Sequence, residues 1–399
     1  MIEWLSNLNL PIIGTLKHQG VDVVASLIAA VLIAAIAYLI TKLWRLMMWV
    51  KLYFERVDKA KADVKRKQIN GIETEGDGVW TAKPIIHPDH YLTTVNGSKI
   101  LAVANLKGGV GKTTISANLA SCLAEMLNKH AGEGQEKPVL LIDLDFQGTL
   151  AGMAKPNKRI WPPKKHHSSH ATKLISGELT PHHLIDLHFP ANERELVEII
   201  PAYYELAQAE NRLMVEWLLS DRKKDVRYTL AEVLHHPLVQ EKYSLIIIDC
   251  PPRLTTAAIQ ALCASTHLLI PTILDGASAN AVSSFVNQVE NLREADICPH
   301  IKHIGVVGSM LIPGQSYDNI YLKLEDLLNT SREAGGSGNV TSVINKDIFI
   351  PRYRAIANAA SEGIIYPIKD DDGTIAQNIN SSFENLSLHV KDRMGLQSS

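Results

Sequence analysis

The chain has 399 residues, of which 46% are hydrophobic and 21% charged, an ordinary composition for one or two folded domains. A net charge of −2 and a pI near 6.8 exclude a globally basic protein that attracts nucleic acid by bulk electrostatics. The four cysteines form no CxxC pair, so the sequence suggests neither a zinc site nor a disulfide framework, and a reducing cytoplasm suits the main domain.

The first predicted element is a membrane helix over residues 23–41. Residues 23–40 form an unbroken run of 18 residues without a charge, about the length that crosses 30 Å of hydrocarbon. A buried core helix is one alternative, although such a helix rarely lacks a polar stripe. A cleaved signal peptide is another, but the basic n-region and an A-x-A site are missing.

The charges on either side of this run predict its orientation. Residues 1–22 carry a side-chain charge of −1, whereas residues 41–70 hold nine Lys or Arg against three acids. By the positive-inside rule, residues 1–22 are a short extracytoplasmic N-terminus and the rest lies in the cytoplasm. Residues 42–98 then read as an interfacial basic helix, with Trp44, Trp49 and Tyr53 at the membrane surface, followed by a Gly- and Pro-rich linker.

From residue 99 onward, short apolar runs alternate with helical stretches. The expected strands are 99–105, 138–145, 197–204, 243–249, 266–273 and 303–311, with helices that include 113–128 and 277–295. Because these runs are continuously apolar rather than alternating, the strands should be covered on both faces. The sequence therefore predicts an α/β fold with a doubly wound, mostly parallel sheet.

A glycine loop, "NLKGGVGKTT" at residues 105–114, lies between the first strand and its helix. The P-loop pattern requires a glycine at the position that Leu106 occupies in this chain. The loop lacks that glycine but carries a second lysine, Lys107. Backbone N–H groups of the loop would cradle phosphates, Lys112 would reach the β- and γ-phosphates, and Thr113 would ligate Mg²⁺. The predicted nucleotide-binding residues here are Gly108, Gly109, Val110, Gly111, Lys112, Thr113 and Thr114.

Three acids end two other strands. Asp143 and Asp145 follow "VLLI", and we expect both carboxylates on one side of a period-2 backbone. Asp249 ends "YSLIII" and is the expected carboxylate that holds Mg²⁺ through water.

The motifs "KGGVGKTT", "LLIDLDFQG" and "IIIDCPP" resemble those of the ParA/MinD family of deviant-Walker-A ATPases, over a domain of residues 99–399. The resemblance implies ATP and Mg²⁺ as cofactors and a homodimer that forms with ATP. In that dimer Lys107 would touch the partner's phosphates, Asp145 would position water, and Asp143, Asp249 and Thr113 would support Mg²⁺. It also places Met310 and Pro351 in segments similar to the family's adenine-contacting segments.

The chain departs from the family at two places. Phe146 and Thr149 stand where the family's acid motif has proline and asparagine. Residues 151–196 are enlarged or divergent and include the basic, His-rich loop 155–170. This loop could contact DNA, anionic lipid or an acidic partner, or simply be solvated; a metal site there lacks regular ligand spacing.

The function expected from these features is that of a membrane-anchored ATPase in a bacterial inner membrane. It would dimerise with ATP, recruit or position an unidentified protein partner, and reset on slow, partner-stimulated hydrolysis. One alternative is a scaffold that binds ATP without turnover. Another is a bacterial tyrosine kinase, although residues 386–399 lack the usual tyrosine cluster.

Overall fold

In the computed structural model the chain divides into two compact units, Met1–Glu73 and Thr74–Ser399. The structure describes residues 22–69, 78–84, 86–91, 99–153, 169–191, 194–219, 224–333, 341–354, 356, 366–367 and 373–397.

The N-terminal unit contains one helix, α2 (Asp22–Ile69), which runs without a break for 48 residues. Neither glycine nor proline interrupts it, so nothing local ends the helix where the apolar run gives way to basic residues. Within it, residues Ala30–Val57 are long and apolar enough to cross a membrane, and none of that window is buried in the protein. The expected apolar helix is therefore present, and it continues through the basic stretch that follows. Residues 1–21 lie outside the described part of the chain.

The second unit is built on a six-stranded sheet in the order β3-β2-β4-β1-β5-β6, and every strand pair is parallel. The predicted α/β fold is confirmed, and all six expected apolar runs are strands. Their bounds are β1 (Lys99–Val103), β2 (Val139–Asp143), β3 (Val197–Ile200), β4 (Leu245–Asp249), β5 (His267–Ile273) and β6 (Lys302–Ser309).

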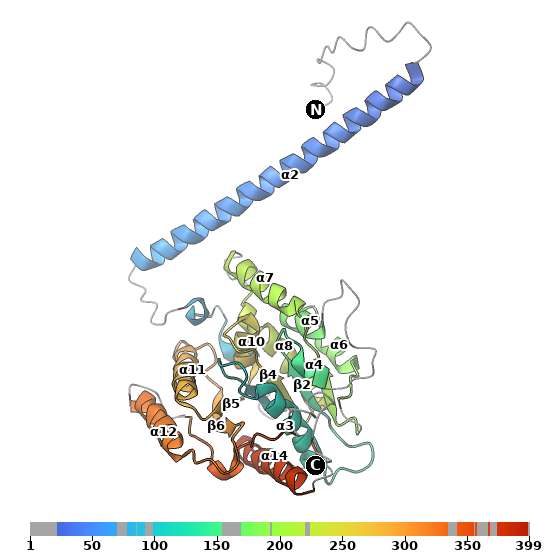
Figure 1. Ribbon diagram of the computed structural model, residues 1–399. Helices are drawn as coiled ribbons and strands as arrows, with labels where there is room; N and C mark the ends of the chain where they lie inside the picture. Colours follow the sequence, from blue (N-terminus) through green and yellow to red (C-terminus); the bar gives the residue numbers. More distant parts are fainter. Residues whose placement is uncertain are drawn as a thin grey trace. The chain divides into compact units, whose positions relative to one another are not determined.

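Helices cover both faces of this sheet (Figure 1). On one face α3 (Lys112–Leu127) packs on β2 and β4, and α14 (Gly373–Met394) lies beside it. On the other face α10 (Thr256–Ala264) packs on β1, and α11 (Gly276–Glu294) packs on β5 and against α12 (Asp318–Glu333). The connections from β1 and from β5 run in opposite directions across the sheet, so right-handed crossovers put their helices on opposite faces.

The remaining described elements are short, apart from one helix that follows β3. They are α4 (Thr149–Met153), α5 (His170–Ser176), α6 (Pro181–Asp186), α7 (Glu205–Leu219), α8 (Thr229–Leu234) and α9 (Pro237–Lys242), with 3₁₀ turns η2 (Val79–Thr81), η3 (Pro88–Tyr91), η4 (Val226–Tyr228) and η5 (Lys346–Ile348).

Residues 78–84 and 86–91, which fall in the expected linker, belong to the second unit, and aromatic residues in both ranges pack on its core. Arg227 is fully buried and donates hydrogen bonds to the carbonyl oxygens of Trp80 and Ala82, both at 2.7 Å. Its other nitrogens bind Asp225 as a bidentate pair, at 2.8 and 2.5 Å. The Trp80 ring stacks on Trp217 with 5.9 Å between ring centroids. A charged clamp and an aromatic pair thus attach this segment to the fold.

We expect Arg227→Met to destabilise the second unit by about 3–5 kcal/mol, because it leaves the Asp225 carboxylate buried without its cation. Urea denaturation would measure the change. Arg212→Met is the control, since Arg212 is exposed and its ion pair with Glu216 is long, at 3.9 Å. Equal unfolding midpoints for the two variants would contradict a stabilising role of the clamp.

Candidate nucleotide site

The glycine loop connects β1 to α3 at the carboxyl edge of the sheet. Gly109 and Gly111 have φ of 71° and 80°, a left-handed conformation in which side chains other than glycine are strained. Val110 between them is buried, and its carbonyl oxygen accepts a hydrogen bond from Ser309 Oγ at 2.6 Å. A Cβ at Gly108 would meet nothing within 4 Å, so the backbone there is open to approach by a ligand.

The start of α3 supplies the positive end of the loop. Gly111 is the N-cap and has no side chain to satisfy the first N–H groups of the helix, to which Lys112, Thr113 and Thr114 belong. Such an end favours an anion, because the free N–H groups and the helix dipole point at it. The Lys112 ammonium lies in the same place and donates to the carbonyl oxygen of Lys107 at 3.0 Å. Burial lowers the pKa of Lys112, while the nearby Asp249 opposes this effect.

Asp143 and Asp249 end neighbouring strands and lie opposite each other in the register of β2 and β4. Both are buried. Asp143 accepts hydrogen bonds from the N–H groups of Asp145 (3.0 Å) and Ala151 (3.4 Å). Asp249 accepts one from Ser116 Oγ at 3.0 Å through Oδ1, and its buried Oδ2 accepts none from the described residues. An orphaned carboxylate oxygen beside a phosphate-type loop suits a water ligand of Mg²⁺.

The environment makes both carboxyl groups hard to ionise. Burial raises the pKa of Asp249 to about 7, although the Thr113 hydroxyl and the Lys112 ammonium counteract part of the rise. Burial also raises the pKa of Asp143 well above its usual range, and the charge of Asp249 adds to this effect. A divalent cation near the pair would favour the ionised forms of both acids.

Contrary to the expectation from the sequence, Asp145 does not lie on the same strand face as Asp143. β2 ends at Asp143, so Asp145 is in the loop beyond it, where the period-2 rule no longer applies. Its Oδ1 accepts a hydrogen bond from the Gln147 N–H at 3.1 Å, and its side chain is half-buried at the carboxyl edge. Phe146 next to it packs against the core, and Thr149 begins α4. The loop therefore turns away from the strand immediately after Asp143.

Lys107 is held within its own chain. Its Nζ lies 3.2 Å from Asp275 Oδ2 and donates to Ser278 Oγ at 2.6 Å. Asp275 is the N-cap of α11, and the N–H of Ser278 donates to its Oδ1 at 2.7 Å, which is the main cause of a lowered Asp275 pKa. Asn105 shapes the loop from the other side, because its Oδ1 accepts from the Lys107 N–H and its Nδ2 donates to Pro271.

Met310 and Pro351 lie on adjoining segments beyond β6. Met310 has a φ of 57°, and its Cε would lie 3.8 Å from a Cβ placed on Gly111, so its side chain is beside the glycine loop. Pro351 forms a bridge with Leu311, one residue further along. The structure thus places Met310 beside the glycine loop and Pro351 beside Leu311.

Sequence reasoning did not single out five residues that form these contacts: Asn105, Ser116, Asp275, Ser278 and Ser309. A signal existed for two of them. Asp275 and Ser278 follow a strand as D-x-x-S, the spacing of a helix N-cap whose side chain accepts from the third helical N–H.

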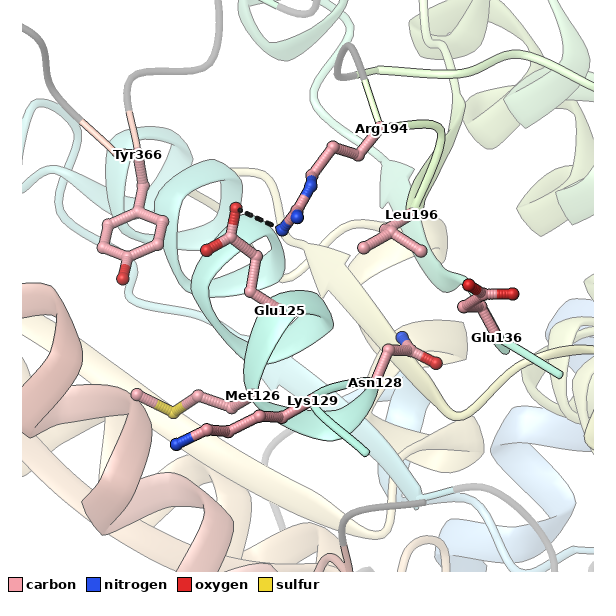
Figure 2. A pocket seen from close by; sticks show the side chains of 8 residues that line it. All are labelled: Glu125, Met126, Asn128, Lys129, Glu136, Arg194, Leu196 and Tyr366. Atoms are coloured by element: carbon pink, nitrogen blue, oxygen red, sulfur yellow. Dashed lines mark ion pairs between the residues drawn. The ribbon is translucent and has the colours of Figure 1, made fainter. Parts of the chain in front are cut away.

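A cavity of about 620 Å³ lies away from this site, at the other end of α3. Figure 2 shows its charged lining, in which Arg194 forms an ion pair of 3.6 Å with Glu125. The candidate nucleotide site itself is the open edge of the sheet rather than this cavity.

No group of three or more His, Cys, Asp and Glu side chains suited to a metal occurs in the described part of the chain. The expectation for the His-rich loop 155–170 lies outside the described residues, except for its last two positions, 169 and 170.

Comparisons with known proteins agree with the geometry. Residues 98–302 match the family model AAA_31, described as an AAA domain. The chain is 33% identical to the sporulation initiation inhibitor protein Soj of Bacillus subtilis over 191 residues, 48% of this chain and 64% of Soj. It is 28% identical to the chromosome partitioning protein ParA of Caulobacter vibrioides over 284 residues, 69% of this chain and 90% of that protein.

A solved structure shares the fold. The ATP complex of McdA from Cyanothece superposes with a TM-score of 0.56 at 19% identity, covering 76% of this chain and 98% of that one.

The raised pKa of Asp249 predicts how stability depends on pH without a metal ion. The protonated acid stabilises the fold in full below its ordinary pKa of 3.8, and this contribution is lost as the pH rises through about 7. Asp249→Asn keeps the shape of the side chain without its charge. In EDTA we therefore expect the free energy of unfolding of this variant to exceed that of the wild type by a few kcal/mol at pH 8 and to equal it near pH 4. Urea midpoints at both pH values would test this, and parallel pH profiles for the two proteins would contradict it.

Proposed function

Because the chain belongs to the ParA/MinD family of P-loop ATPases, we propose that it hydrolyses ATP and uses the bound nucleotide as a dimerisation switch. The observation that carries the proposal is the presence of two lysines on one glycine loop at the sheet edge where two buried acids end β2 and β4. Lys112 faces back into its own loop, whereas Lys107 reaches outward to α11 with its side chain one-third exposed.

ATP and Mg²⁺ fit the residues at the carboxyl edge. The N–H groups of Gly108 to Gly111 and the start of α3 would hold the phosphates, with Lys112 neutralising their charge. Thr113 and the two buried acids would hold Mg²⁺, the acids through water. The metal supplies stabilisation of the charge that develops on the transferred phosphoryl group.

Asp145 is the acid we propose to position the attacking water. It is the half-buried acid in the loop after β2, and the hydrogen bond from the Gln147 N–H fixes one of its oxygens. The other two acids are buried and suited to the metal instead.

The ATP-bound form would be a homodimer in which each Lys107 contacts the phosphates of its partner. For that role the lysine must leave Asp275 and Ser278, to which it is bound here. The pair is partly exposed, with 32% and 46% of the two side chains accessible, so breaking it costs about 1 kcal/mol or less. The contact is weak enough to act as a resting position.

The first unit would anchor this switch. We propose that residues 23–41 cross a bacterial inner membrane, with residues 1–22 outside and the basic stretch after residue 41 at the cytoplasmic surface. Residues 42–98 would connect this span to the ATPase domain, 99–399. Support comes from the apolar helix and from the excess of Lys and Arg after it. A fixed position at the membrane would let the ATP-bound dimer recruit or position a protein partner there; DNA is a further candidate partner.

Light scattering on the second unit, Thr74–Ser399, would test the switch. We expect ATP with Mg²⁺ to form a dimer that Lys107→Ala abolishes while lowering turnover by about 10³-fold, because a charge supplied in trans is lost. Asp145→Ala should form the dimer and keep it, since hydrolysis no longer resets it. Lys129→Ala, an exposed lysine at the far end of α3, is the control. ATP binding without a change of mass or phosphate release would favour a scaffold.

Asp275→Asn tests the resting position of Lys107. Asparagine caps a helix as well as aspartate does, but it lacks the charge that holds the lysine. We expect half-maximal dimerisation at an ATP concentration up to about fivefold lower than for the wild type. Asp318→Asn, which removes a different exposed lysine pair, should leave this concentration unchanged. A higher ATP requirement for Asp275→Asn would mean that Asp275 supports Lys107 in the dimer instead.

A further inference from the structure

Helix α2 is longer than a membrane span needs. Its 48 residues extend for about 72 Å, whereas the hydrocarbon core of a bilayer is about 30 Å thick. A large part of the helix therefore lies beyond the membrane, within the basic stretch that ends at Ile69. An isolated helix of this polar character is only marginally stable in water, so the continuous helix calls for a packing partner.

A heptad repeat of apolar residues runs through α2 from residue 36 to residue 64. The a positions are Ile36, Leu43, Val50, Val57 and Val64. The d positions are Leu39, Leu46, Tyr53 and Ala60. The repeat covers four heptads without a polar interruption, as a coiled coil requires.

The repeat is clearest where the helix is polar. In residues 55–69 the apolar residues are few, and three of them, Val57, Ala60 and Val64, occupy successive a, d and a positions. Lipid contact alone would not require that spacing beyond the membrane. In the N-terminal part of the repeat, the stripe formed by the a and d positions is exposed, with 53% of Ile36, 63% of Leu43 and 45% of Tyr53 accessible to solvent.

We propose that α2 pairs with α2 of a second copy of this chain as a parallel two-stranded coiled coil. The a positions are β-branched except Leu43, and two of the four d positions, 39 and 46, are leucine. β-Branched residues at a with leucine at d favour two strands. The parallel direction rests on the membrane anchoring proposed above, because two copies inserted in one membrane point the same way.

The flanking charges provide a test of the register of this pair. In a parallel coiled coil, a g position faces the e position five residues later in the partner. In the proposed pair Arg56 at g would face position 61, a lysine at e in the sequence, so two like charges would meet across the seam. This repulsion weakens the pair at one known place, and replacing Lys61 by an acid turns it into attraction.

The pair would hold two ATPase domains close together before ATP binds. Linking two modules makes their second contact intramolecular and raises its effective concentration, with the short connection after Ile69 as the linker. Dimerisation of the nucleotide sites would then depend on ATP rather than on the number of copies in the membrane.

Cysteine cross-linking of the full-length protein in bacterial membranes tests the proposal. The native cysteines can stay, because Cys122, Cys250, Cys263 and Cys298 are all buried. Val57→Cys and Val64→Cys place thiols on the stripe, whereas Glu55→Cys and Ala62→Cys place them at the outward f positions. Each variant is made with and without Lys107→Ala, which removes the proposed ATP-bound dimer, and is oxidised without added nucleotide.

We expect a dimer band severalfold stronger at the two stripe positions than at the two outward positions. Equal bands at all four positions, or bands that disappear with Lys107→Ala, would overturn the pairing of α2. Extraction of the membranes with carbonate serves as a separate readout, since release of the protein would contradict the anchoring and hence the parallel direction.

Lys61→Glu supplies a test of register with a matched control. We expect it to raise the cross-linked fraction of Val64→Cys, because it pairs with Arg56 of the other copy. Lys59→Glu makes the same change of charge at a c position and should have no such effect. The same response to both substitutions would contradict the parallel register.

Discussion

The candidate site depends on two buried carboxylates at the ends of adjacent parallel strands. Asp143 and Asp249 lie in register on β2 and β4, and β1, which leads into the glycine loop, is the next strand along. Parallel strands bring all three carboxyl ends to one edge. Burial of two acids near each other is unfavourable unless a proton or a cation compensates, and the nearby Lys112 compensates the charge of Asp249 only in part. A metal-bound polyanion, as proposed for this edge, would supply the missing compensation.

The loop geometry adds a second constraint. Gly109 and Gly111 adopt left-handed conformations, and the hydrogen bond from Ser309 to the Val110 carbonyl oxygen attaches the loop to the end of β6. The ion pair between Lys107 and Asp275 links the loop to the start of α11. Breaking this ion pair would therefore remove a contact at the N-terminus of α11, a helix that packs against β5 and α12.

The two units follow different physical rules. The second unit buries its apolar residues in one core on both faces of the sheet. The first unit exposes its apolar residues along α2 and needs lipid, a second helix or both to cover them. Within the second unit, Arg227 binds the carbonyl oxygens of Trp80 and Ala82 and so attaches the segment before β1 to the core.

Local patterns in the sequence determined the strands, the glycine loop and the apolar helix, because each depends on residues close together in the chain. Continuous apolar runs indicated a parallel sheet, and glycines before a Lys-Thr-Thr helix start indicated an anion site. Only the tertiary structure decided that Asp145 leaves the strand, that Lys107 binds Asp275, and that Trp80 is held by Arg227. These contacts join residues up to 168 positions apart, and which distant side chains meet depends on strand order and helix packing rather than on spacing.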